Sequence, residues 1–495
     1  MQLSTIKTWE EISKAASASW PEPNSPDPLK AEAKRIQSLS DTTSEQIEAA
    51  IRFVQDEFRY LSVNLEVGGQ IPAAPDVVLR RRYGDCKDLS LLLSSLLNEL
   101  GVSARPVLVH YTLGKHLESL LPSPALFDHV VVEFSDEGRL HWVDATMILQ
   151  GGGIQGRLIA DFHSGLPLVS DGAALTQQPK REASVDQLEV QDTLILDTAD
   201  NPLVLRVQTT AHGQFADTFR NQHANAGAEG FAELMKQQQS ARFDISKMLE
   251  QPKFEDDRTA NLWRMVELYE VPSLPPAEGP KVIFKLPPSI VLSALQLPDS
   301  GARSKPFAIP NRLKIKHATE IRCKGATRKP PINRTHKQNG VEFQLEAKYR
   351  SNMRTFTTSV ETSTDSIPAE AIKDYREMLA HVIKRYTFSF SLPAGVANTY
   401  REIDFFKLPQ VGRPKVKEFR KLESSLIPLA PKGQTIRAHP KRLGREIDPI
   451  IKDEPEWINE MDEEDPQEPT SLLVLIGLAL TFIAAFALAL YVFTR

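Results

Sequence analysis

Residues 80–101, "RRRYGDCKDLSLLLSSLLNELG", contain the start and stop signals of a helix around a leucine-rich run. Asp85 is a favourable residue for a helix N-cap, and Gly101 is typical of the position just after a helix ends. Between them, leucines recur at the three-and-four spacing of a helix that is buried on one broad face: Leu89, Leu92, Leu93, Leu96, Leu97 and Leu100. The pattern predicts a buried helix that begins at Cys86.

The predicted position of Cys86 favours a reactive thiol. The first turn of a helix has unpaired N–H groups and the positive end of the helix dipole, both of which stabilise a thiolate relative to a thiol. Cys86 lies three and seven positions before Leu89 and Leu93, so it should point toward the packed side and be reached through a cleft. A small apolar residue at the edge of a core is an equally good interpretation on position alone.

A hairpin is predicted over residues 126–146, "LFDHVVVEFSDEGRLHWVDAT". If Glu137 and Gly138 form the loop, Asp136 pairs with Arg139 and the register continues along both strands. His129 and Asp144 then fall on one face as diagonal neighbours, with Cβ atoms roughly 7 Å apart. A slip of one residue would place them on opposite faces. The predicted register brings an imidazole within reach of a carboxylate.

A further helix is predicted from Ser44 to about Tyr60. Thr43 and Gln46 fit the capping-box pattern at its start. Its apolar stripe consists of Ile47, Ile51, Val54 and Phe58. Helices followed by an antiparallel hairpin predict an α+β fold in which the helix that bears Cys86 packs on the sheet that bears His129 and Asp144.

Composition narrows the classes of protein. A chain of 495 residues with 41% hydrophobic and 25% charged residues is typical of two or three globular domains. The formal charge of -5 gives no basic field, so no nucleic-acid partner is expected. Two cysteines this far apart, Cys86 and Cys323, exclude a disulfide framework. We find no phosphate-binding glycine loop and no metal-ligand spacing, so neither cofactor nor metal is expected.

The sequence after the predicted hairpin indicates a β-rich region. Residues 185–365 contain alternating runs bounded by Gly, Pro or Asn, which predict antiparallel strands in a sandwich-like arrangement. Two helices interrupt or close it, one near residues 214–242 and one after Ser366 as a plausible N-cap. The second helix places Ile372, Tyr375, Leu379, Val382 and Tyr386 on one face. Cys323, in "TEIRCKG", lies in a strand pattern and is interpreted as a structural cysteine.

The C-terminal part predicts a membrane anchor on a charged stalk. Residues 472–493 run for 22 residues without a charge, enough to cross about 30 Å of hydrocarbon. The charged residues of 413–452 are mostly basic and those of 453–468 are all acidic, a pattern typical of a solvated stalk. The alternative is that the basic segment contacts anionic lipid. The predicted domains are therefore 1–165, 166–400 (β-rich), 401–470 (stalk) and 471–493 (transmembrane helix).

Three blocks carry a family resemblance: "YGDCKDLSLLLSSLLNELGVSARPVLV", "FDHVVVEF" and "HWVDAT". They resemble the motif blocks of the transglutaminase-like superfamily of papain-like cysteine enzymes, over about 130 residues of a catalytic core. The upstream "EVGGQIPAAPDVVLRRRYGDCKD" resembles a bacterial branch in which this domain lies between β-rich domains. By motif match, the resemblance makes Cys86 the nucleophile, His129 the general base and acid, and Asp144 the group that orients His129.

The expected chemistry is acyl transfer or hydrolysis on a peptide or carboxamide through a thioester. The first half-reaction is common to cross-linking and hydrolysis, so the triad does not distinguish them, and the sequence does not reveal the substrate. The alternative is a catalytically silent relative that serves as a binding or assembly module at the membrane. A redox or metal role for Cys86 is disfavoured because the chain offers it no partner cysteine or ligand cluster.

The charges around the apolar C-terminal segment predict the orientation of the chain in a membrane. Arg495 follows the apolar segment and the preceding flank is acidic back to Lys452, which favours a cytoplasmic C-terminus with the rest of the chain outside a bacterial inner membrane. The resemblance implies the same periplasmic side. The first 20 residues show no secretion signal, which favours the cytoplasmic orientation. Because relatives of that branch begin with a signal and a β-rich domain, we expect either a start upstream of Met1 or separate encoding of that part.

Overall fold

The computed structural model describes residues 6–21, 27–61, 71–180, 186–195, 203–271, 277–278, 281–298, 304–322, 330–350 and 353–393. Three predictions lie outside these residues: the stalk, the transmembrane helix at 472–493, and the strand position of Cys323. Within the described ranges, no helix has the length and apolar character needed to span a bilayer.

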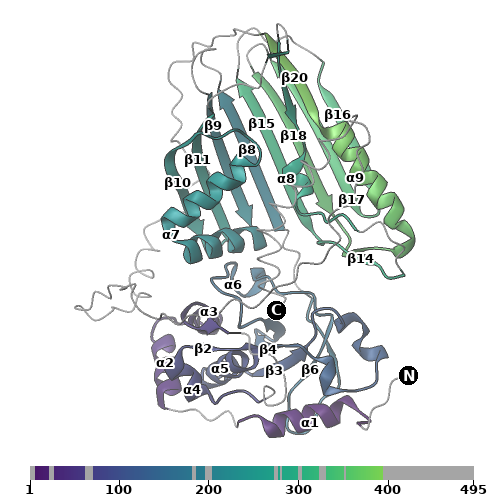
Figure 1. Ribbon diagram of the computed structural model, residues 1–495. Coiled ribbons are helices and arrows are strands. Elements are labelled where there is room, and N and C mark those ends of the chain that lie inside the picture. The colour runs from purple at the N-terminus through teal and green to yellow at the C-terminus, as the bar shows by residue number, and fades with distance from the viewer. Residues whose placement is uncertain are drawn as a thin grey trace, which may run out of the picture. The chain divides into compact units, whose positions relative to one another are not determined.

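The N-terminal region combines helices with a five-stranded sheet (Figure 1). The sheet has the order β5-β4-β3-β6-β7, and all of its recorded pairings are antiparallel. The helical elements of this N-terminal region are α1 (Trp9–Ser19), α2 (Asp27–Gln37), α3 (Thr43–Glu57), α4 (Pro75–Arg81), α5 (Cys86–Glu99), η1 (Gly114–Ser119), η2 (Pro124–Leu126) and α6 (Gly153–Gly156). The strands of the region are β1 (Arg59–Tyr60), β2 (Tyr83–Gly84), β3 (Ala104–Val109), β4 (His129–Asp136), β5 (Arg139–Val143), β6 (Ser164–Pro167) and β7 (Thr176–Gln177).

Helix α5 is the centre of this region. The leucines predicted to be its buried face are all buried, and they share one core with Val132 and Phe134 of β4. Helices α2, α3 and α4 also pack against α5, which explains why its buried face is so broad. Gly101 follows the helix with φ +80°, a conformation that glycine adopts without strain. The predicted helix and its end are confirmed.

Helix α3 corrects the predicted start. Thr42, not Thr43, is the N-cap, and its side chain accepts the Glu45 N–H at 3.3 Å. The hydroxyls of Ser40 and Thr42 both donate to the Glu45 carboxylate, at 2.7 and 2.8 Å, which fixes the first turn one residue earlier than the Thr43–Gln46 pattern suggested. The helix ends at Glu57, because the next residues form β1 and pair with β2 in parallel.

The second region is built on an eight-stranded sheet of order β10-β11-β9-β8-β15-β18-β17-β16. Its pairings are antiparallel except for β8 with β15, which run parallel at the centre over ten residue pairs. The strands are β8 (Asp186–Ile195), β9 (Leu203–His212), β10 (Lys247–Asp257), β11 (Leu262–Val271), β15 (Leu313–Arg322), β16 (Ile332–Gln338), β17 (Val341–Arg350) and β18 (Met353–Thr362). Alternate residues of β15 are buried, as the period-2 pattern predicts.

Helices pack on one face of this large sheet (Figure 1). They are α7 (Gln214–Ser240), α8 (Ser289–Leu292) and α9 (Ile372–Tyr386), the last preceded by η3 (Ala369–Ala371). The shorter strands are β12 (Ala277–Glu278), β13 (Lys281–Leu286), β14 (Phe307–Ala308), β19 (Ser366–Ile367) and β20 (Phe388–Pro393). The region is β-rich as expected. Beside the eight-stranded sheet it contains a three-stranded sheet of order β12-β13-β20, and Leu286 of β13 packs against the same core as the helices.

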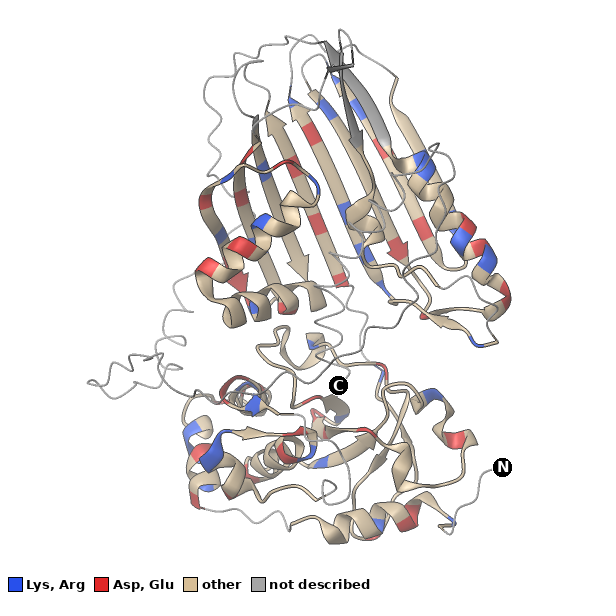
Figure 2. Cartoon of the chain, viewed as in Figure 1, with Lys and Arg blue, Asp and Glu red and all other residues tan. Residues whose placement is uncertain are grey.

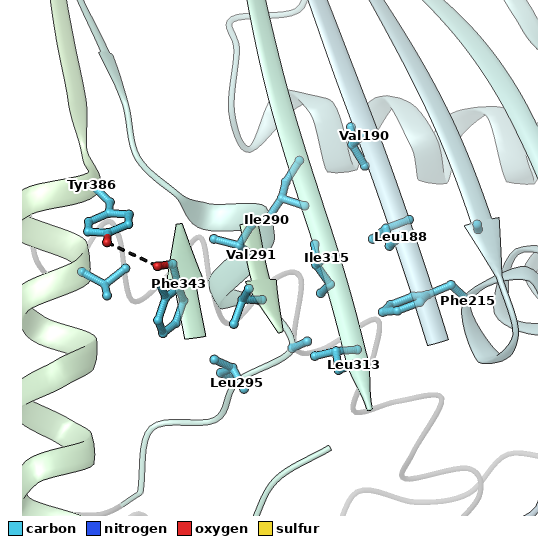
Figure 3. Close-up of a cluster of buried hydrophobic side chains, with 14 of the residues drawn as sticks. Leu188, Val190, Phe215, Ile290, Val291, Leu295, Leu313, Ile315, Phe343 and Tyr386 are labelled. Carbon is cyan, nitrogen blue, oxygen red and sulfur yellow. Dashed lines mark hydrogen bonds between the residues drawn. The ribbon is translucent and has the colours of Figure 1, made fainter. Parts of the chain in front are cut away.

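One continuous apolar core joins these helices to the sheet (Figure 3). Ile290 and Val291 of α8 are buried against Ile315 of β15, and the Tyr386 hydroxyl of α9 donates to the Phe343 carbonyl at 3.5 Å. The five apolar residues predicted to share one face of α9 are all buried. Ser366 is not the N-cap of that helix, because it pairs in β19 with β14 and the helix starts at Ile372.

Charges of both signs are mixed over the described surface. In Figure 2, positions occupied by Lys or Arg are interspersed with positions occupied by Asp or Glu along α9 and the large sheet. Many exposed charges are paired locally, as in Lys314 with Glu361 at 2.7 Å. Such surface pairs contribute roughly 0–1 kcal/mol each to folding stability, so we interpret these charges as keeping the surface solvated.

Candidate active site

The start of helix α5 is fixed by a reciprocal capping box. The Asp85 carboxylate accepts the Asp88 N–H at 3.2 Å, and the Asp88 carboxylate accepts the Asp85 N–H at 3.2 Å. Asp88 also accepts the Ala73 N–H at 2.8 Å and pairs with Arg81. Cys86 is thus the first helical residue, as predicted, and the capping box fixes the turn in which it lies.

Gly84 is required for this turn to close. A Cβ atom at this position would lie 2.7 Å from the Asp88 Cβ, which is closer than such atoms approach in proteins. The backbone of Gly84 also accepts the Leu61 N–H at 2.9 Å, which ties the turn to the chain after α3. Glycine at the third place of "RYGDC" therefore has a packing reason as well as a place in the motif.

The hairpin has the predicted register. Asp136 pairs with Arg139 and Val132 pairs with Val143, with Glu137 and Gly138 in the loop at φ +48° and +77°. Two positive φ values fit the tight turn that matches the twist of the strands. The ladder of β4 and β5 ends at Val143, so Asp144 is the first residue beyond it.

His129 and Asp144 meet on one face of this hairpin. The His129 Nε2 lies 2.8 Å from the Asp144 Oδ2, and both side chains are 4% exposed. The other carboxylate oxygen, Oδ1, accepts the Thr146 N–H at 2.9 Å and the Thr146 hydroxyl at 2.7 Å. Both oxygens of Asp144 are therefore engaged, which fixes the carboxylate plane toward the imidazole.

Cys86 completes the group. Its side chain is 5% exposed, and its proximity to the His129 imidazole is among the influences that raise the pKa of that ring. Because Nε2 is bonded to Asp144, Nδ1 is the ring nitrogen left for the thiol. The structure thus brings together the three side chains that the sequence singled out, in the order thiol, imidazole, carboxylate.

Electrostatics in this buried group favour a charged imidazole. Burial alone lowers the pKa of His129, but the Asp144 charge and hydrogen bond, together with Cys86, outweigh it and raise this pKa to about 10. Burial raises the pKa of Asp144, but His129 and the bonds from Thr146 outweigh burial and hold it below its ordinary value. The site therefore stabilises an imidazolium between a carboxylate and a thiol at neutral pH.

Two aromatic side chains flank the imidazole, and sequence reasoning missed both. The Tyr111 ring centroid lies 4.9 Å from that of His129, and the Phe162 ring is stacked with His129 at 5.9 Å. Tyr111 follows β3, whose last residue pairs with His129, so its proximity follows from strand pairing that a local motif does not reveal. These rings limit water around the bond between His129 and Asp144.

Two other aromatic residues near the motifs have structural partners. The Trp142 Nε1 donates to the buried Glu133 carboxylate at 2.9 Å. The Tyr83 ring is 43% exposed and lies under the Arg81 guanidinium, 4.8 Å from its centroid. Trp142 is therefore a core residue of the sheet, while Tyr83 is available at the surface beside α5.

One group of described residues has the spacing of a metal site. Ligand atoms of Asp161, His163 and Asp365 lie within 4.8 Å of one another. The Lys115 Nζ lies 3.3 Å from the Asp365 carboxylate, and His163 Nδ1 lies 3.3 Å from Asp161. Because these side chains already pair with one another and with a cation, we interpret them as an ion-pair cluster.

An α+β domain with a cysteine at the start of a buried helix, and with histidine and aspartate on the adjoining sheet, has a cysteine-protease-like fold. Residues 30–147 match the family model of the transglutaminase-like superfamily, and this part of the chain is a transglutaminase-like domain. The matched range contains all three residues of the site.

A crystal structure described as a "putative protease" from Parabacteroides distasonis aligns with a TM-score of 0.48 and 14% identity, over 78% of this chain and 59% of that one. This chain thus spans 59% of the length of that protein. The comparison with curated proteins gives no match.

Proposed function

We propose that this protein is a transglutaminase-like cysteine enzyme that carries out acyl transfer or hydrolysis on a peptide or carboxamide. The observation that carries the proposal is the 2.8 Å bond between His129 and Asp144, with Cys86 at the start of α5 near enough to influence the pKa of the same imidazole. A nucleophile, a base and a group that orients the base are what thiol-based acyl transfer requires.

Each residue has a separate role in the reaction. The Cys86 thiolate attacks the substrate carbonyl, and the N–H groups at the first turn of α5, which have no intrahelical acceptor, stabilise the oxyanion. His129 then gives its proton to the departing amine as the C–N bond breaks, leaving a thioester on Cys86. Water or a second amine attacks the thioester while His129 takes its proton and Cys86 leaves as the thiolate. Asp144 holds the imidazole in the required orientation throughout.

One experiment separates the two reaction types. The purified chain is incubated with a glutamine-containing peptide, with and without a primary amine, and both ammonia release and peptide cleavage are followed. Ammonia without cleavage indicates action on a side-chain carboxamide; new peptide termini indicate proteolysis. Either activity should disappear in Cys86→Ser, because the hydroxyl is not expected to ionise in this site. Activity that survives in Cys86→Ser contradicts the proposal.

A binding or assembly module is the second candidate. The 5% exposure of Cys86 and the large β-rich region favour it, since a silent relative needs a surface but no accessible thiol. An electrophilic probe for activated thiols decides between them. Labelling of wild-type protein that is absent from Cys86→Ser supports the enzyme, whereas no labelling of Cys86 supports the module.

The C-terminal part completes the proposal. Residues 472–493 act as a single-pass anchor in a bacterial inner membrane, residues 401–470 as a stalk, and the preceding domains face the periplasm, where a protein or peptide substrate is met. The support is the uncharged 22-residue run and the charge bias around it. Added protease should digest the chain in intact spheroplasts; full protection of residues 1–400 would reverse the orientation.

A further inference from the structure

The backbone of Asp144 is held by a residue that no motif contains. Asp144 lies just beyond the β4–β5 ladder, so its carbonyl lacks a strand partner on that side. The Gln55 side-chain amide of α3 donates to this carbonyl at 2.8 Å. Gln55 is 1% exposed. The Met147 N–H also reaches this carbonyl, at 3.4 Å. Because a buried carbonyl needs a donor, Gln55 supplies the shorter bond in place of the missing strand at the residue that orients His129.

Gln55 is itself fixed at both ends of its amide. Its Nε2 also donates to the Gln150 Oε1 at 2.9 Å, and its Oε1 accepts the Arg157 guanidinium at 2.8 Å. Arg157 is buried and pairs with Glu48, which lies two turns before Gln55 on α3. Every polar atom of the Gln55 amide group is therefore directed by another buried side chain, which leaves it one rotamer.

The network continues to Arg258 in the turn between β10 and β11. The Arg258 Nε donates to the Gln150 carbonyl at 3.0 Å, and its two terminal nitrogens each lie 2.6 Å from the Asp56 carboxylate. Asp56 follows Gln55 on α3. A residue of the β-rich region thus contacts both the helix that carries Gln55 and the segment that follows Asp144.

We propose that Gln55 is a positioning residue of the active site, which acts through the Asp144 backbone to hold the carboxylate against His129. The inference rests on the proposed function, because it assigns a role in orienting the same thiol–imidazole–carboxylate group. Thr146 fixes the carboxylate and Gln55 fixes the main chain that carries it. Without Gln55, the Asp144 carbonyl retains only the longer bond from the Met147 N–H, at 3.4 Å, which lies within the same short segment.

The test compares two matched glutamines on α3. Gln46 also donates its amide to a main-chain carbonyl, that of Ser40 at 2.9 Å, but at the start of the helix. In the full-length chain, Gln55→Met and Gln46→Met each remove one hydrogen bond from a glutamine amide to a main-chain carbonyl. We expect Cys86 alkylation by iodoacetamide at pH 6 to slow roughly 10- to 100-fold in Gln55→Met and to stay within twofold of wild type in Gln46→Met. Equal rates in wild type and Gln55→Met overturn the inference.

A double-mutant cycle shows whether Gln55 acts through Asp144. Adding Gln55→Met to Asp144→Asn should slow alkylation by less than twofold, because the group being positioned has already been disabled. Two effects that multiply would show that Gln55 acts independently of Asp144 and overturn the inference. If Gln55→Met does not fold, as judged by circular dichroism, Gln55→Asn replaces it, since the shorter amide keeps the polarity but withdraws the donor.

Failure of the proposed function gives a different result from failure of this inference. If wild-type Cys86 reacts no faster than the same cysteine in the unfolded chain, the proposed enzyme is wrong and Gln55 has nothing to position. If Cys86 alkylation is fast in wild type and equally fast in Gln55→Met, only the role given to Gln55 is wrong. The alkylation readout requires no knowledge of the substrate.

Discussion

Replacing Asp144 by asparagine should lower the pKa at which His129 loses its proton. The carboxylate charge is the largest influence that raises this pKa, whereas burial lowers it. Asparagine keeps the size of the side chain and its contact with Thr146 but removes the charge. The imidazole of the variant then remains buried with no carboxylate to compensate, so its neutral form is favoured.

The magnitude follows from the site. The rise of the His129 pKa from 6.5 to about 10 corresponds to about 5 kcal/mol in favour of the imidazolium. Because the pKa is raised in the folded state, the ion pair stabilises the fold fully below about pH 6.5, and the contribution is lost as pH rises through about 10. In Asp144→Asn we expect His129 to titrate near or below pH 7, so the charged form is absent at pH 8.

Two alkylating reagents measure this pKa. Iodoacetamide is neutral and reports the thiolate of Cys86, whereas iodoacetate is an anion and also responds to the positive charge of His129. The ratio of the iodoacetate rate to the iodoacetamide rate should fall with a midpoint near pH 10 in wild type and near or below pH 7 in Asp144→Asn. His129→Ala, the control, should show no midpoint. The same midpoint in wild type and Asp144→Asn would refute the role given to Asp144.

Three further outcomes are expected. Gly84→Ala should displace Asp88 from the capping box and slow Cys86 alkylation roughly tenfold, since the added Cβ would lie 2.7 Å from the Asp88 Cβ; an unchanged rate would contradict this. Burial raises the pKa of Glu267 to about 7, so the folded state loses stability as pH rises from about 4.5 to 7. Glu267→Gln should therefore be more stable than wild type by up to ~3 kcal/mol at pH 8 but not at pH 4. Thermal unfolding at the two pH values measures this difference. Removing residues 472–495 should move the chain from the detergent phase to the aqueous phase of a Triton X-114 partition.

The parts of the site that the sequence predicted are those set by local rules. The start of α5 follows from Asp85 and the leucine spacing, both within one helix and its first turn. The register of the hairpin follows from a two-residue loop that leaves one way to align the strands, so His129 and Asp144 fall on one face. Their bond is a consequence of that alignment, fifteen residues apart in sequence.

The parts that were missed depend on contacts distant in sequence. Gln55 lies 89 positions from the carbonyl that it binds, and Arg157 lies 102 positions from Gln55; a buried glutamine on a helix shows no pattern of its own. The way in which helices cover the large sheet was not predicted, for a similar reason. Alternation in β15 shows that one face is buried, but not whether a sheet or helices such as α7 and α9 cover it.

The central claim is that Cys86 is an activated nucleophile, and its alkylation rate tests this most directly. Folded and urea-unfolded full-length protein are treated with iodoacetamide at pH 6, and the peptides that contain Cys86 and Cys323 are quantified by mass spectrometry over time. We predict that Cys86 reacts at least roughly tenfold faster in the folded than in the unfolded chain, while folding does not accelerate Cys323. A folded-state rate for Cys86 at or below its unfolded-state rate would contradict the account.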